Sequence, residues 1–299
     1  MEREGAVPKS IMLIINPYSG KGLSRYALGT VISRLCDADH NVTVYFSREQ
    51  TPEQLARSYA GSHDIAVCVG GDGTLSSLIS GLLEAGISIP VGYIPAGTSN
   101  DIAATLALSG FPSAASRTII NGTPRRLDIG KFHDRYFTYI AAFGAFTSVS
   151  YQTPQSVKRA LGHFAYVLTG IADMAAIKPR RTTIEYDGNT IEGEFIFGAV
   201  ANSTSVARLV KLDPDLVDLS DGRFEIILVK QPIVPADFID ILASVAVKTY
   251  DGDNVQVLQA SNIKFTFDED TAWTVDGENG GMHREAVISV CHKAIEIIV

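Results

Sequence analysis

The amino-acid sequence predicts an α/β amino-terminal domain built on a parallel sheet, followed by a β-rich antiparallel carboxyl-terminal domain. Three observations favour this fold class. The chain has 299 residues, which is long for one domain and suits two. Up to about residue 128, short apolar runs alternate with helical patterns, as in a parallel α/β sheet. Beyond that point, β-prone segments and hairpin turns dominate. We therefore assign residues 1–128 to the first domain and 129–292 to the second.

Composition narrows the class of protein. With 25 Lys and Arg against 33 Asp and Glu, the formal net charge is −8, which argues against a nucleic-acid partner. Three widely spaced cysteines without a C-x-x-C pair favour a reducing cytosol over a disulfide scaffold or a zinc site. We find no apolar stretch of membrane-spanning length and no signal-peptide pattern at the start, so we expect a cytoplasmic protein that is free to touch a membrane surface.

In the first domain we expect strands and helices in alternation. The predicted strands are residues 11–15, 42–46, 65–69 and 89–94. The predicted helices are residues 23–35, 52–60 and 75–84, with a fourth from about residue 101, and Thr51 is placed to cap the second. Because ligands of such sheets bind at the carboxyl ends of the strands, we expect the functional site in the loops there.

The second half has a different sequence pattern, in which β-prone segments and hairpin turns predominate. Residues 132–146 are aromatic and β-prone, residues 155–177 indicate one long helix, and residues 181–202 indicate two strands around an Asp187-Gly188-Asn189 turn. A strand at 222–230 and a helix at 236–249 follow, and from residue 255 to the end we expect mostly short strands.

The loop after the first strand carries Asn16, Pro17, Ser19 and Gly20. Glycines let backbone N–H groups approach an anion, and the N-terminus of the following helix adds partial positive charge. The spacing matches neither a Walker A loop nor a Rossmann fingerprint. An ordinary tight turn explains the same residues, so this loop alone does not decide between the two interpretations.

The loop after the third strand carries Gly70, Gly71, Asp72, Gly73 and Thr74. Three glycines around one acid are costly unless the backbone bends sharply or approaches a ligand. We therefore expect the N–H groups to cradle phosphate oxygens and Asp72 to hold a divalent cation, directly or through water. The alternative is a structural Asp that caps the next helix.

The loop after the fourth strand carries Gly97, Thr98, Asn100 and Asp101. It places Asp101 at the same edge of the sheet as Asp72. Two carboxylates at a phosphate site would repel each other without a metal between them, so the pattern implies Mg²⁺. A helix cap formed by Asn100 or Asp101 is the alternative for this loop taken by itself.

Together with a late Trp273-x-x-Asp276-Gly277-Glu278 segment, these three loops occur in a fixed order over nearly the whole chain. In that combination the sequence resembles the diacylglycerol-kinase-like lipid kinases, which include bacterial diacylglycerol kinases and sphingosine kinases. The second loop alone would be weak, since NAD kinases and phosphofructokinases share it. The resemblance implies a phosphofructokinase-like nucleotide domain and a β-rich lipid-binding domain with the nucleotide between them. It also implies that residues 293–299 return to the first domain.

The resemblance further implies ATP as phosphate donor and Mg²⁺ as cofactor. It places ATP on the three loops, with Ser47 after the second strand as a further contact. A second, structural Mg²⁺ is implied at an Asp-x-x-Asp-Gly turn, where Asp218, Asp221 and the backbone of Arg223 fit, although a plain hairpin turn would also explain that turn. The residues so implied in ATP binding are Asn16, Pro17, Ser19, Gly20, Ser47, Gly70, Gly71, Asp72, Gly73, Thr74, Gly97, Thr98 and Asn100, and those implied as metal ligands are Asp72, Asp101, Asp218, Asp221 and Arg223.

Two positions depart from the family pattern. The family usually has Asn-Glu where this chain has Ser76-Ser77, and it often has a Gly-Gly pair after Asn202 where this chain has Ser205-Val206-Ala207-Arg208. The second departure falls in the lipid-binding half, so it bears on which lipid is used more than on phosphoryl transfer.

Phosphoryl transfer to an alcohol also needs a base for the hydroxyl proton. Asp276 is our first choice, with Glu278 two residues on to tune or orient it. On local sequence alone Asp276-Gly277 favours a plain β-turn, but its place after Trp273 in the fourth motif favours the base. If Asp276 is the base, Asp276→Asn would keep the turn with little change in melting temperature and would lose the proton acceptor. The expected activity is therefore an ATP-dependent lipid kinase acting on diacylglycerol or a similar neutral lipid alcohol.

Two rivals remain from the sequence: an NAD kinase, and a non-catalytic nucleotide- or lipid-binding relative. An NAD kinase does not require the Asn16 and Trp273 segments, yet both are present here. A non-catalytic relative would be favoured if Asp72 or Asp276 had been lost, and both are retained. The expected partner is a lipid substrate at a membrane surface, met by peripheral contact, and the family resemblance alone suggests a homodimer. The local basic run at Lys178 is either a contact for anionic headgroups or a solvated turn.

Overall fold

The computed structural model describes residues 7–19, 25–144, 178–206, 210–212, 217–234, 236–237, 240–241, 244, 250 and 252–299. It divides into two compact units, which are taken separately below. Unit 1 comprises residues 1–129 and 292–299, and unit 2 comprises residues 130–291. The chain passes from one unit to the other within β5 (Pro124–Phe132) and again within β15 (Glu278–Ile298).

Unit 1 is built on a parallel sheet whose strand order is β2-β1-β3-β4, continued by the end of β15. Neighbouring strands pair in parallel, and Ile297 of β15 lies beside Val91 of β4. Runs such as Ile-Ala-Val-Cys-Val in β3 are buried throughout, as expected for strands that are covered on both faces. The strands are β1 (Ser10–Ile15), β2 (Asn41–Phe46), β3 (Ile65–Gly70) and β4 (Val91–Pro95).

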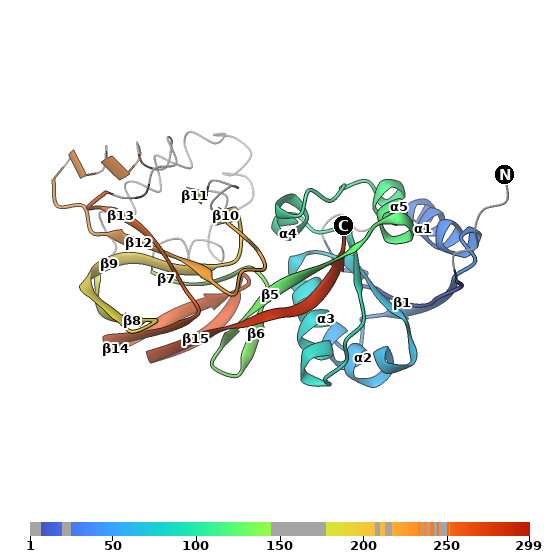
Figure 1. Ribbon diagram of the computed structural model, residues 1–299, viewed down its shortest axis with the longest axis horizontal. Helices are drawn as coiled ribbons and strands as arrows, with labels where there is room; N and C mark the ends of the chain where they lie inside the picture. The colour runs from blue at the N-terminus through green and yellow to red at the C-terminus, as the bar shows by residue number, and fades with distance from the viewer. Residues whose placement is uncertain are drawn as a thin grey trace. The chain divides into compact units, whose positions relative to one another are not determined.

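Helices cover both faces of this sheet (Figure 1). Helices α1 and α5 pack together on one face, and α2 and α3 pack together on the other. A short helix, α4, follows β4. The helices are α1 (Arg25–Asp37), α2 (Pro52–Tyr59), α3 (Asp72–Glu84), α4 (Asp101–Thr105) and α5 (Pro112–Asn121), with a 3₁₀ turn at Ala60–Ser62.

Local sequence signals set several of these boundaries. Thr51 caps α2 in a capping box: its hydroxyl accepts the N–H of Gln54, and the Gln54 side chain accepts the N–H of Thr51. Pro52 occupies the first turn, where its missing N–H costs nothing. Ser77, one of the two departures from the family pattern, accepts the Glu53 N–H and so joins α3 to α2.

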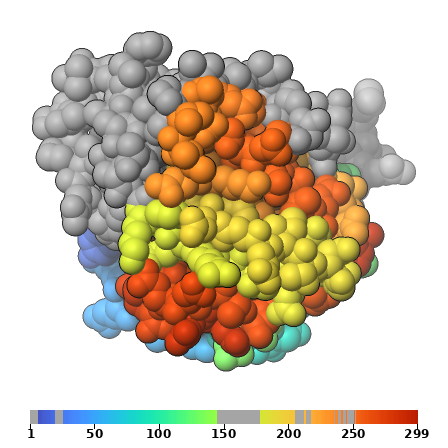
Figure 2. Space-filling model, turned by 90° about the vertical axis from the view of Figure 1, so that its left-hand side faces the viewer, coloured from blue at the N-terminus to red at the C-terminus, as the bar shows by residue number. Residues whose placement is uncertain are grey.

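Unit 2 is an antiparallel sheet system with the strand order β13-β12-β9-β7-β14-β15, in which β8 pairs with β14 and β9. Figure 2 shows β8 and β9 as a yellow band across one face of this unit. Its strands are β6 (Arg135–Phe137), β7 (Ile140–Gly144), β8 (Arg180–Tyr186), β9 (Asn189–Ala201), β10 (Ser205–Val206), β11 (Val210–Lys211), β12 (Phe224–Lys230), β13 (Val255–Ala260) and β14 (Asn262–Val275).

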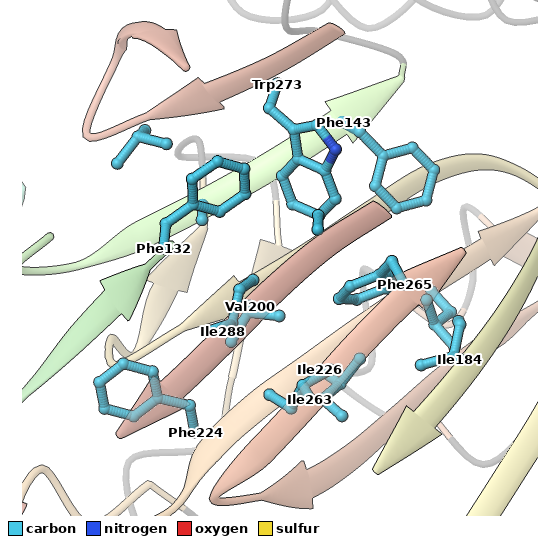
Figure 3. Close-up of a cluster of buried hydrophobic side chains, with 14 of the residues drawn as sticks. Phe132, Phe143, Ile184, Val200, Phe224, Ile226, Ile263, Phe265, Trp273 and Ile288 are labelled. Carbon is cyan, nitrogen blue, oxygen red and sulfur yellow. The ribbon is translucent and has the colours of Figure 1, made fainter. Parts of the chain in front are cut away.

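An aromatic cluster forms the centre of the unit 2 core. The Trp273 indole lies between Phe132 and Phe143, with ring centroids 5.1 Å from each (Figure 3). Phe265 packs edge-on at 5.2 Å. Trp273 is 2% exposed, so the tryptophan of the late motif is a core residue that fixes the end of β14 three residues before Asp276.

The prediction of mostly short strands after residue 255 is wrong. β14 has 14 residues and β15 has 21. The charged stretch around Asp268 and the Gly-Gly pair at 280–281 do not end the strands, because the ladder continues past register shifts between Thr266 and Thr271 and between Trp273 and Thr274.

Other expectations fall partly or wholly outside the described residues. They include the long helix predicted at 155–177, most of the helix predicted at 236–249, and Gly20. The described helices include none that is long and apolar enough to cross a bilayer.

Two helical glycines give a stability test of unit 1. A Cβ on Gly81 would stand 2.4 Å from the Glu53 carbonyl oxygen of α2, whereas a Cβ on Gly29 of α1 would meet no described atom within 4 Å beyond its own stretch of helix. We predict that Gly81→Ala lowers the free energy of unfolding by about 1–3 kcal/mol, since α2 must move. Gly29→Ala should raise it by about 0.5–1 kcal/mol through helix propensity alone. Denaturant melts check both, and equal effects would contradict the α2–α3 packing.

Candidate active site

The first and second strand-end loops of unit 1 meet at Thr74. The Asn16 side-chain amide donates to the Thr74 hydroxyl at 3.0 Å, and the Ser19 and Thr74 hydroxyls lie 3.3 Å apart. Ser19 also accepts the backbone N–H of Gly71 at 3.3 Å. Ser19 and Thr74 are both buried, so these polar contacts form an ordered junction between the two loops.

Asp72 joins the second loop to the third. One carboxylate oxygen accepts the backbone N–H of Asp101 at 3.0 Å, and the other accepts that of Ile102 at 3.2 Å. The side chain is 9% exposed. Asp72 is the first residue of α3, yet its carboxylate satisfies N–H groups at the start of α4, 29 and 30 residues further along. Asp72 therefore does cap a helix, as the structural alternative from the sequence expected. The helix it caps is α4, however, and not α3, which Asp72 itself begins.

Glycines are required where the second and third loops touch. A Cβ on Gly97 would lie 2.5 Å from the Gly71 Cα, and one on Gly71 would lie 3.1 Å from the Gly97 Cα. A Cβ on Gly70 would collide with the Thr74 side chain at 2.6 Å. None of the three has a positive φ. Close packing, of backbone on backbone at Gly71 and Gly97 and of backbone on the Thr74 side chain at Gly70, is thus the constraint on these glycines, and not a sharp bend.

Asn100 and Tyr93 complete the third loop. The Asn100 side chain accepts the Gly97 N–H at 2.9 Å and donates to the Gly97 carbonyl at 3.1 Å. It adopts a left-handed conformation with φ 53°, which Asn tolerates well. Tyr93, 2% exposed in β4, directs its hydroxyl at Asn100. Burial, together with the Asp72 charge, raises the pKa of Tyr93, so its hydroxyl stays a donor.

The remaining predicted ATP contacts of unit 1 lie along the same strand ends. Ser47 directly follows β2, is 9% exposed, and donates through both its N–H and its hydroxyl to the Ile15 carbonyl. Pro17 lies in the turn after β1. Gly73 and Thr98 are exposed. The N-terminus of α3 carries no side-chain cap, so its first N–H groups are oriented to meet an anion.

In unit 2, the predicted metal turn precedes β12. Asp218 accepts the N–H and hydroxyl of Ser220, and Asp221 accepts the N–H of Arg223 at 2.9 Å. Nearby Glu225 is 3% exposed, and its Oε2 has no hydrogen-bond partner among the described atoms. Burial, reinforced by the charge of Asp221, raises the pKa of Glu225 to about 7. The start of β12, directly after this turn, therefore holds a buried carboxyl group whose environment disfavours its charge.

Asp276 of the late motif lies in the two-residue turn between β14 and β15. Asp276 and Gly277 have φ values of 48° and 82°, and positive φ at both positions is what a type I′ hairpin requires. The carboxylate accepts four hydrogen bonds: the N–H and hydroxyl of Thr138 on Oδ2 at 2.7 and 2.9 Å, and the N–H groups of Tyr139 and Ile140 on Oδ1 at 3.1 Å each. Asp276 thus orders the segment that connects β6 to β7.

Glu278 has a more open environment. Its side chain is 66% exposed, and Oε2 accepts a hydrogen bond from the Arg135 guanidinium at 2.6 Å. Sequence analysis missed Arg135 and Tyr93. Tyr93 could have been found as a hydroxyl-bearing residue inside the buried strand that leads into the third loop, whereas nothing local marks Arg135.

Comparison with known proteins identifies the family and the fold. Residues 10–132 match the family described as diacylglycerol kinase catalytic domain. Residues 142–299 match the family described as YegS C-terminal NAD kinase beta sandwich-like domain. Two solved structures from Bacillus anthracis str. Sterne share the fold: one, described as a diacylglycerol kinase, aligns with a TM-score of 0.75 at 18% identity, and the other with a TM-score of 0.81 at 22%. Each alignment covers 97% of this chain and 96% of the other.

Relatives found by sequence share a higher identity with this chain than these two structures do. The diacylglycerol kinase of Staphylococcus saprophyticus is 35% identical over 276 residues, which cover 91% of this chain and 90% of that protein. The diacylglycerol kinase of Staphylococcus epidermidis is 34% identical over the same share of this chain and 87% of its own length. The chain therefore belongs to the diacylglycerol kinase family. It is accordingly a lipid kinase, with ATP as its phosphate donor.

The contacts of Asp276 predict a loss of stability that the sequence did not suggest. Asn suits the left-handed turn position as well as Asp, but its amide NH₂ would face backbone donors. We predict that Asp276→Asn lowers the free energy of unfolding by about 2–3 kcal/mol. The matched control is Asp187→Asn at the Asp187-Gly188 turn, whose φ values are 42° and 85° and whose exposed carboxylate accepts two N–H groups. It should cost less than about 1 kcal/mol.

Thermal and denaturant melts of both variants provide the measurement. Equal losses would show that the buried hydrogen bonds of Asp276 add nothing beyond those of an ordinary Asp-Gly turn. Because Asp276→Asn is expected to weaken the fold locally, its loss of activity would not by itself identify the general base.

Proposed function

We propose that this chain transfers the terminal phosphoryl group of ATP to the hydroxyl of diacylglycerol or a similar neutral lipid alcohol. The observation that carries the proposal is the 35% identity to a diacylglycerol kinase over 91% of the chain. The linked strand-end loops support it, because phosphoryl transfer depends on positioning and on stabilisation of charge more than on covalent chemistry by the protein.

Unit 1 would hold the ATP phosphates in a phosphofructokinase-like arrangement. The uncapped N-terminus of α3 and the exposed Gly73 offer N–H groups and partial positive charge. Ser19 and Asn100 now accept the N–H groups of Gly71 and Gly97, so phosphate oxygens could take their place. Asn16, Pro17, Ser47, Gly70, Thr74 and Thr98 would line the same edge, as would Gly20, which lies outside the described residues.

Mg²⁺ fits the donors of this edge. Mg²⁺ commonly takes one or two protein carboxylates and completes its shell with waters and phosphate oxygens. Asp72 and Asp101 would supply such carboxylates, since the backbone N–H of Asp101 donates to the Asp72 carboxylate. Among the described residues no three His, Cys, Asp or Glu side chains gather to hold a metal. Bound there, Mg²⁺ would neutralise phosphate charge.

A second Mg²⁺ fits the turn of Asp218, Asp221 and the Arg223 backbone. The donors are hard oxygens, and the unpartnered Oε2 of buried Glu225 is the kind of atom that a nearby cation would stabilise. The proposed role is structural, in fixing the start of β12.

Asp276 and Glu278 would provide the acid–base function. A carboxylate has about four lone-pair positions, and four donors already occupy those of Asp276. Glu278 is exposed and is the better placed of the two to accept the substrate proton. We therefore reverse the order that the sequence suggested: Glu278 acts as the base, and Asp276 holds the turn that presents it.

The proposed partner is a membrane surface that contains the lipid substrate, met by peripheral contact from a cytoplasmic protein; a homodimer is a further proposal from the family resemblance. The basic run near residue 178 contributes less than its sequence suggests, since Lys178 and Arg180 both pair with Glu269.

The substrate proposal is tested with radiolabelled ATP and four acceptors presented in parallel: diacylglycerol, a sphingoid base, phosphatidylglycerol and NAD. We predict label in diacylglycerol as phosphatidic acid, and none in NAD. Labelling of a different lipid would support the lipid-kinase activity and would change the proposed substrate. Efficient formation of NADP, or no transfer to any lipid with ATP and Mg²⁺ present, would contradict the proposal.

The second metal site predicts a nucleotide-independent effect of Mg²⁺. A ligand that binds the folded state at 100 times its Kd adds about 2.7 kcal/mol of stability. Without ATP, Mg²⁺ should therefore raise the melting temperature of the unmodified protein by several degrees over EDTA, and Asp221→Asn should lose this rise. Asp187→Asn, at an Asp turn outside the site, should keep it. The site is refuted if Asp221→Asn responds to Mg²⁺ as fully as the unmodified protein.

A further inference from the structure

An arginine contacts the segment that carries Glu278 at two points. Arg135 belongs to the short strand β6, 143 residues before Glu278 in the chain. Its Nη2 donates to Glu278 Oε2 at 2.6 Å, and its Nη1 donates to the Asn279 carbonyl oxygen at 3.2 Å. One planar guanidinium thus binds both the carboxylate and the backbone beside it.

This double contact distinguishes the pair from an ordinary surface ion pair. An exposed Arg–Glu bridge adds little stability, because both long side chains lose entropy and water screens their charges. The Arg fork has a rigid geometry, so contact with the Asn279 carbonyl fixes the guanidinium and, through it, the direction of the Glu278 carboxylate. The expected consequence is orientation more than stability.

The segment after Glu278 is ordered by further contacts. The Asn279 side-chain oxygen accepts the Gly281 N–H at 2.8 Å, and His283 Nε2 lies 2.8 Å from the Gly280 carbonyl oxygen. The His283 ring stacks on His133 with centroids 4.6 Å apart. His133 and Arg135 come from the same β5–β6 hairpin, which therefore holds the start of β15 at two places.

We propose that Arg135 is a positioning residue that holds the Glu278 carboxylate in the direction needed to accept the substrate proton. The inference rests on the proposed function, in which Glu278 is the base. A base must come within hydrogen-bond reach of the proton it removes, and a misplacement of about 1 Å can reduce a rate by up to about 100-fold. Arg135 touches no reacting atom in this account and acts through Glu278.

The test compares kcat on diacylglycerol for Arg135→Ala and Arg135→Lys with that of a matched control, Arg126→Ala. Arg126 of β5 pairs with Glu296 of β15 at 3.0 Å, another exposed Arg–Glu contact but outside the late motif. We expect kcat to fall about 10- to 100-fold for Arg135→Ala, with KM for ATP within about twofold and an unchanged melting temperature. Arg135→Lys keeps the charge but not the forked guanidinium, so its kcat should lie between those of Arg135→Ala and the unmodified protein. The kcat of Arg126→Ala should match that of the unmodified protein.

Chemical rescue separates positioning from a general structural effect. Guanidinium at a non-denaturing concentration should restore part of the kcat of Arg135→Ala, and none is expected for Arg126→Ala. If Arg135→Ala fails to fold, the reduced kcat of Arg135→Lys at an unchanged melting temperature supports the proposal, and normal kcat in that variant overturns it.

Glu278→Gln distinguishes failure of this inference from failure of the proposed function. Full activity in Glu278→Gln would remove the base assignment and this inference with it. Loss of activity in Glu278→Gln, together with normal kcat in Arg135→Ala, would overturn the role of Arg135 and leave Glu278 as the base. Equal losses in Arg135→Ala and Arg126→Ala without guanidinium rescue would likewise overturn it.

Discussion

The arrangement of unit 1 depends on the carboxylate of Asp72. It is buried, it starts one helix, and it binds the backbone N–H groups at the start of another. The short helix α4 has no side-chain cap of its own, so Asp72 supplies what local sequence does not. With the close approach of Gly71 to Gly97, this contact makes the second and third loops a single structural element. Thr74 then attaches the first loop through Asn16 and Ser19.

A buried carboxylate also accepts backbone N–H groups of a distant segment in unit 2, where Asp276 binds those of residues 138–140. Here the turn is also anchored from the other side by Trp273 in the aromatic core. In both places an acid that the sequence marks as chemically active also orders the backbone around it. Functional and structural interpretations of these aspartates therefore do not exclude each other, and Glu278 is the more exposed carboxylate of the late motif.

Much of the fold could be predicted because its signals are local. Buried apolar runs located the strands of unit 1, Thr51 located the start of α2, and Asp187-Gly188 located the hairpin between β8 and β9. The gathering of the three loops followed from parallel strands ending at one edge. The long strands β14 and β15 could not be predicted, because register shifts let them pass residues that normally end a strand.

The contacts that give the candidate site its geometry could not be derived from the sequence. Asp72 with Asp101, Asp276 with Thr138, and Glu278 with Arg135 join residues 29, 138 and 143 positions apart. No periodicity or turn preference encodes such pairs, since they exist once tertiary packing has brought the segments together. The sequence marked Asp72, Asp276 and Glu278 as candidates and left open which of their atoms are already engaged.

The most direct test of the account is to map the residues at which ATP binds. Backbone amide chemical shifts of isotope-labelled protein, followed by NMR during titration with Mg²⁺ and a non-hydrolysable ATP analogue, report this without turnover. The account predicts that the largest changes fall on Gly71, Gly73 and Gly97, with neighbouring changes at Ser19 and Asp101. Saturable changes concentrated away from these loops, for example in the groove between α1 and α5 lined by Arg34 and Arg117, would contradict it.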